Sequence, residues 1–92
     1  MSQRILIKGT QIVVPNSVGS ATNFSNATCV RLINNGSSGR TVTVAEDTSG
    51  NTTIGTFSLL ASQTEFLEKN PTDVVYVGGG TDVQGASVGF TN

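Results

Sequence analysis

Residues 28–60 decide the fold, and they read TCVRLINNGSSGRTVTVAEDTSGNTTIGTFSLL. Apolar and β-branched residues alternate with polar ones in 29–34, 40–45 and 52–60, a period-2 pattern typical of strands. Clusters of Asn, Gly and Ser separate the segments, and Asn-Gly supplies the positive φ that hairpin turns need. The stretch therefore predicts three strands joined as a β-meander at the centre of the protein. Its expected core residues are Val30, Leu32, Val42, Val44, Phe57 and Leu59.

Two short strands are expected before this centre, over residues 4–8 (RILIK) and 11–14 (QIVV). Pro15 lacks an N–H for a strand ladder and should end the second of them or mark a sheet edge. The polar connection 16–26 carries one large apolar residue, Phe24, whose ring we expect to pin this segment to the core.

Further strands are expected after it, at 63–69, 73–77 and 83–90, with Gly78-Gly79-Gly80 as a turn. In 63–69 we expect Phe66 to face inward and Glu65 and Lys69 to face outward. Ile54 breaks the alternation of the third central strand, which indicates a β-bulge. About eight short strands with regular turn signals predict a single all-β domain over 1–92, an antiparallel sandwich or small barrel. Phe66, Val75 and Val77 complete the expected core.

The composition indicates a surface that is poor in charge. Only 12% of the residues are charged, against a typical value of about 25%. Thr, Ser and Asn are abundant, which is usual in domains packed against copies or partners, although an uncharged free domain would look the same. The net charge of −1 comes from scattered residues, so binding to nucleic acid is not expected. No segment resembles a signal peptide or a membrane span, so synthesis in a cytoplasm and no membrane partner are expected.

Several kinds of chemistry lack the residues they need. The chain has no histidine and one cysteine, which removes His-dependent triads and a Cys/His zinc site. The six carboxylates form no pair suited to acid–base catalysis. The sequence therefore predicts no enzyme activity, no cofactor and no metal. Cys29 is expected to be a buried small hydrophobe, with a reactive thiol beside Arg31 as the weaker alternative.

Two weak patterns have simpler explanations. Residues 47–51 (DTSGN) loosely resemble a calcium loop but lack its alternating ligands and distal Glu, so a hairpin turn is favoured. The three glycines at 78–80 lack the strand–loop–helix context and the Lys of a phosphate cradle. Tyr76 could contact a ligand, but a strand tyrosine with its hydroxyl at the rim explains it as well.

Five segments carry a resemblance that covers most of the chain. They are LIKGT (6–10), ATCVRLINNGSS with VTV (27–38 and 42–44), IGTFSL (54–59), EKNPTD (68–73) and VGFTN (88–92). The pattern resembles small β-rich virion structural proteins of tailed phages of marine and cyanobacterial hosts. The resemblance implies a capsid decoration or cement protein on the virion surface. Its implied partners are the major capsid protein and copies of itself, with a homotrimer favoured.

The chain ends are the expected contact regions. Residues 1–14 and 83–92 combine apolar residues and glycine in what are expected to be edge strands, which tend to pair with other chains. Two alternatives remain open: a tail or neck component, and an adhesion module that binds a host surface or polysaccharide through Tyr76 and the loops 34–40 and 78–82. The interface residues expected from the edge-strand pattern are Ile5, Leu6, Ile7, Ile12, Val13, Val88 and Phe90.

Overall fold

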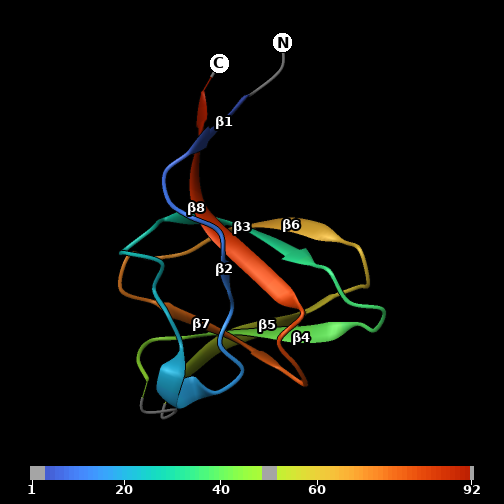
Figure 1. Ribbon diagram of the computed structural model, residues 1–92. Helices are drawn as coiled ribbons and strands as arrows, with labels where there is room; N and C mark the ends of the chain where they lie inside the picture. The colour runs from blue at the N-terminus through green and yellow to red at the C-terminus, as the bar shows by residue number, and fades with distance from the viewer. Residues whose placement is uncertain (1–3, 49–51, 92) are drawn as a thin grey trace.

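The computed structural model describes residues 4–48 and 52–91, and the side chains of 5–48 and 52–89. It is all-β, with antiparallel strands in two sheets, as the strand pattern predicts (Figure 1). The strands of the described residues are β1 (Arg4–Ile7), β2 (Ile12–Val13), β3 (Cys29–Asn34), β4 (Arg40–Ala45), β5 (Thr53–Leu59), β6 (Thr64–Glu68), β7 (Val74–Gly78) and β8 (Val83–Thr91), with a short 3₁₀ turn, η1 (Val18–Ser20).

The two sheets pack face to face as a sandwich. One sheet has the strand order β1-β8-β3-β6, with β2 also paired to β8, and the other has the order β5-β4-β7. An isolated antiparallel bridge between Thr22 and Val75 ties the connection between η1 and β3 to β7. The sequence did not distinguish a sandwich from a small barrel. The described strands form two separate sheets, as in a sandwich.

The predicted meander has two hairpin connections, and the structure contains only the second of them, between β4 and β5. β4 and β5 form the expected hairpin, but β3 pairs with β6 and β8 and does not pair with β4. The segment between β3 and β4 therefore crosses from one sheet to the other. Residues 36–38 form a bend, and neither Asn35 nor Gly36 has the positive φ that a hairpin turn needs, so the hairpin expected from Asn-Gly is wrong here. A turn-prone residue favours a local backbone geometry and does not specify the partner of the strands beside it.

Asn34 explains why the chain can cross at this point. Its side chain is fully buried, and its Nδ2 donates to the carbonyl oxygens of Ser38 (2.8 Å) and Leu59 (3.0 Å). Its Oδ1 accepts a hydrogen bond from the N–H of Gly36 at 2.9 Å. One amide thus satisfies three backbone groups that the β3–β4 crossing and the end of β5 would otherwise leave unpaired.

The strand alternation correctly predicts a bulge at Ile54. The register of β4 on β5 passes from Val44 opposite Gly55 to Ala45 opposite Thr53, so Ile54 is the extra residue. Its side chain is exposed. A bulge at this edge strand bends β5 and interrupts the regular ladder.

In β6 the predicted facing is wrong. Phe66 is 43% exposed, and its neighbour Leu67 packs against the core instead. Leu67 lies opposite the buried Val30 of β3, which places it on the inner face and Phe66 on the outer face. Lys69 is also buried, whereas an outward position was expected, and Glu65 is exposed as expected.

The core lies between the sheets and contains most of the residues that the alternation predicts. Phe24 is buried there and fixes its loop, as expected. Phe57 is partly buried against the same cluster. The buried members of the cluster are Val14, Phe24, Val30, Leu32, Val42, Val44, Leu59, Val75, Val77 and Val83.

Gly85 of β8 is a position where the core has no room for a side chain. A Cβ there would lie 2.8 Å from Cδ2 of Leu32 and 3.0 Å from Cζ of Phe24. We expect Gly85→Ala to lower the free energy of unfolding by about 1–3 kcal/mol through overpacking, measured by urea denaturation. Gly55→Ala is the matched control, because nothing lies within 4 Å of its Cβ position. Equal stability of the two variants would contradict the packing described for β8.

Candidate functional site

The most unusual surface is a two-stranded ribbon formed by both ends of the described chain. β1 pairs with residues 88–91 of β8, from Arg4 opposite Thr91 to Ile7 opposite Val88. The pairing of β8 with β3 ends at Ser87, so in the described residues this ribbon has no third strand. Figure 1 shows it leaving the body of the sandwich.

The ribbon exposes apolar side chains on both faces. Ile5, Leu6 and Ile7 are consecutive, so they alternate between the two faces, and their exposed fractions are 43%, 49% and 68%. Lys8 follows them and is also exposed. A lone two-stranded ribbon is only marginally stable in water. The exposed apolar ribbon is therefore a candidate contact surface.

The junction at residues 8–9 holds the ribbon to the body. The N–H of Lys8 donates to the carbonyl oxygen of Ser87 at 2.9 Å, which is the last contact before the chain turns into the β2 segment. A Cβ on Gly9 would lie 2.7 Å from Oγ of Ser87, so the backbone passes close to β8 here. β2 then pairs with β8 at residues 84–85 and covers the same edge further along.

The sequence correctly predicts that β1 and β2 are edge strands with exposed apolar residues. Ile12 and Val13 of β2 are exposed like the three residues of β1. Two members of the expected interface differ. Val88 is 3% exposed and cannot contact a partner without rearrangement, and the side chain of Phe90 lies outside the described side chains. The first half of β8 is an interior strand, flanked by β2 and β3, and not an edge.

A second feature is an open groove between the sheets, on the side where β5 and β6 are edge strands. Its volume is about 660 Å³. Its apolar lining comes from Val44, Ile54, Phe57 and Leu67, and Glu68 and Asp73 add carboxylates. No local pattern in the sequence predicts this groove, because its walls come from four separate segments of the chain.

Lys69 also lines the groove, but its amine is occupied by the protein itself. Nζ donates to the carbonyl oxygens of Ala27 (2.7 Å), Asn70 (3.3 Å) and Pro71 (3.3 Å). Burial lowers the pKa of this amine, and the nearby Asp73 carboxylate opposes part of that change. The three backbone contacts indicate a structural role, in which Lys69 fixes the chain after β6.

Cys29 shows no sign of an activated thiol. It lies at the start of β3 and is partly exposed, so the expectation of full burial is wrong. Burial of the sulfur, and to a lesser degree the Glu68 carboxylate, raises the pKa of the thiol. A raised pKa reduces the thiolate fraction, which is the reactive form.

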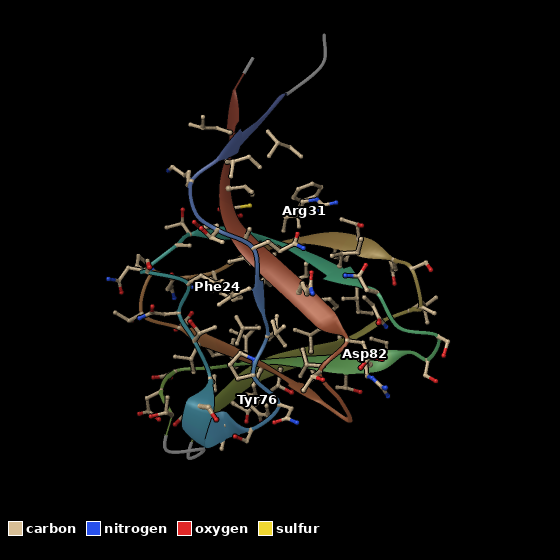
Figure 2. All side chains as sticks on the ribbon, in the orientation of Figure 1. Phe24, Arg31, Tyr76 and Asp82 are labelled. Atoms are coloured by element: carbon tan, nitrogen blue, oxygen red, sulfur yellow. The ribbon has the colours of Figure 1, made fainter. Side chains whose placement is uncertain are left out.

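The two loops named for the adhesion alternative do come together. Arg40 and Asp82 form an ion pair of 3.0 Å, and the N–H of Asn35 donates to the carbonyl oxygen of Asp82 at 3.0 Å. These contacts join the loops to each other. Tyr76 is partly exposed on the face of β7 opposite the core residues Val75 and Val77 (Figure 2).

The described residues contain no group of three or more Cys, Asp or Glu side chains placed to hold a metal ion. The turn at 47–51 lies partly outside the described residues. None of the helical segments in the described part of the chain is long and apolar enough to cross a bilayer. Comparison with protein-family models, curated proteins and solved structures gives no significant match. The ribbon and the groove are thus the two candidate interaction surfaces in the described part of the chain.

Proposed function

We propose that this protein is a non-enzymatic structural component of a virion, a capsid decoration or cement protein that binds the assembled coat and stabilises it. The observation that carries the proposal is the β1/β8 ribbon, which exposes Ile5, Leu6 and Ile7 outside the body of the sandwich. Contiguous exposed apolar residues of this kind mark sites of protein–protein contact.

Three further observations support a docking role. The ribbon is joined to a well-packed sandwich, so the body stays folded while the ribbon contacts a partner. Both long edges of the ribbon carry backbone groups that a neighbouring strand can pair with. The low content of charged residues suits a subunit that packs densely against neighbours. The resemblance to small phage virion proteins makes the coat lattice the specific partner proposed.

The contribution of the ribbon to coat binding is tested with a single substitution. We expect Ile7→Ser to reduce loading onto undecorated shells at least about tenfold, because burying an isoleucine side chain contributes roughly 1.5–3 kcal/mol and 1.4 kcal/mol corresponds to a factor of ten. Loading is measured by co-sedimentation over a range of protein concentrations. Leu60→Ser is the matched control, since Leu60 is 62% exposed and lies outside the ribbon.

Several outcomes would overturn the proposal. If Ile7→Ser loads as well as the wild-type protein, the ribbon is not the docking element. If the wild-type protein ignores shells and forms rings or tubes in electron micrographs, the tail or neck assignment replaces the capsid one. If it does neither and binds glycans on an array, the adhesion assignment replaces both.

A further inference from the structure

The same chain carries an apolar ribbon and an apolar groove, and their charges are opposite. Arg4 and Lys8 are the only ionisable side chains in residues 1–14, and they flank the apolar residues of β1. The groove and the β6 edge beside it carry Glu65, Glu68 and Asp73. Among the described residues, the Lys69 amine lies near the buried Asp73 and offsets its charge, and Arg31 lies opposite Phe66 on the neighbouring strand β3. The exposed carboxylates of Glu65 and Glu68 are therefore the acidic groups that this edge offers to a partner.

The apolar contents of the two surfaces also match. Ile5, Leu6 and Ile7 protrude from the body, and the groove offers Val44, Ile54, Phe57 and Leu67. The ribbon cannot reach the groove of its own chain by strand addition, because β1 and β6 lie at opposite ends of their sheet. A contact between the two therefore joins separate copies.

Strand direction allows such a contact to repeat. The neighbouring strands β1, β8, β3 and β6 are all antiparallel, so the terminal strands β1 and β6 run in opposite directions. When β1 of one copy is placed beside β6 of the next, the pair is again antiparallel. Each copy then offers the same two surfaces to its neighbours, which is a heterologous contact that generates rings or chains of subunits.

A two-fold contact between two ribbons is disfavoured by charge. Antiparallel pairing of β1 with a second β1, centred on Leu6, would place Arg4 of each copy opposite Lys8 of the other. Like charges directly opposite each other on paired strands are destabilising. The acidic β6 edge removes this repulsion and replaces it with attraction.

We propose that the β1/β8 ribbon of one copy docks head to tail into the β5–β6 groove of a second copy of this chain. Ile5 to Ile7 then cover the apolar lining, and Lys8 lies beside the carboxylates of Glu65 and Glu68. This inference rests on the proposed role of the ribbon as a docking element on the shell, and it adds that the groove of a neighbouring copy is part of the surface that the ribbon contacts there.

Cysteine crosslinking of the purified protein tests the contact. In a Cys29→Ser background, copies carrying Leu6→Cys are mixed with differently tagged copies carrying Ile54→Cys, oxidised mildly, and separated on a non-reducing gel. We expect the mixed disulfide to exceed either like-with-like disulfide by about tenfold. Leu60→Cys replaces Ile54→Cys as the matched control, because Leu60 is also exposed (62%, against 52% for Ile54) and lies just beyond the other end of β5, six residues or roughly 20 Å away.

Charge reversal gives a second readout. Lys8→Glu and Glu68→Lys should each weaken self-association about fivefold in concentration-dependent light scattering, and the double variant should regain most of the loss. Dominant Leu6–Leu6 crosslinks, equal crosslinking of the Ile54 and Leu60 positions, or no crosslink above background would overturn the head-to-tail contact. Absent crosslinks together with loss of shell loading in Ile7→Ser would overturn this contact alone and leave the ribbon as a coat-binding element.

Discussion

Truncating Leu59 to alanine is expected to lower the free energy of unfolding by about 2–5 kcal/mol, the range for leucine-to-alanine changes in packed cores. Leu59 is fully buried at the end of β5 and belongs to the cluster between the sheets. Such a loss is a large part of the total stability of a small domain, about 5–15 kcal/mol. The variant should unfold at a much lower temperature than the wild-type protein.

The adjacent residue supplies the control for this prediction. Leu60 is 62% exposed and lies just beyond β5. Leu60→Ala removes the same atoms, and we expect it to change stability by no more than about 0.5 kcal/mol. Urea denaturation of both variants measures the difference. Similar losses at the two positions would mean that β5 does not present Leu59 to the core.

Substituting Asn34 by alanine is expected to lower the free energy of unfolding by about 2–4 kcal/mol. The change leaves the carbonyl oxygens of Ser38 and Leu59 and the N–H of Gly36 without the partner that one amide supplies. A buried polar group left without a partner costs about 1–3 kcal/mol, and water reaching the Ser38 and Gly36 groups will recover part of the sum. The chain crosses between the sheets at this residue, so the effect tests the corrected topology.

Asn35→Ala serves as the comparison for this substitution. Asn35 is exposed in the same turn, and its described contact to Asp82 uses the backbone N–H, which alanine keeps. We expect its thermal unfolding to match that of the wild-type protein closely. If Asn34→Ala unfolds at the same temperature as Asn35→Ala, the side chain of Asn34 does not hold the two sheets together.

Strand positions and most core residues are predictable from the chain because alternation is a local property. Val30, Leu32, Val42 and Val75 follow it, and so does the bulge at Ile54. Strand pairing depends on contacts between distant segments, so the β3–β4 connection was predicted wrongly. In β6 both Phe66 and Leu67 are apolar, and only the pairing of Leu67 with Val30 decides which of them faces inward.

The candidate site is predictable only in part for the same reason. The apolar run Ile5 to Ile7 is visible in the chain, and the expectation that it lies in an edge strand follows from its apolar residues and the nearby Gly9. That β1 pairs with the far end of β8, beyond the reach of β3, is a non-local fact. The burial of Val88 and the β5–β6 groove also depend on contacts between distant segments, and no short pattern encodes them.

The central claim is that the ribbon docks on a protein surface in the assembly. Amide hydrogen exchange of β1, compared between the free protein and the protein loaded on shells, tests it most directly. Because Lys8 donates to Ser87 and ladder hydrogen bonds alternate along antiparallel strands, the N–H groups of Ile5 and Ile7 point to the free edge of β1. We predict that these two N–H groups exchange at least about tenfold more slowly after loading, because exposed edge amides become paired or covered. Unchanged exchange in β1, with new protection at the loops 34–40 and 78–82 instead, would contradict the claim.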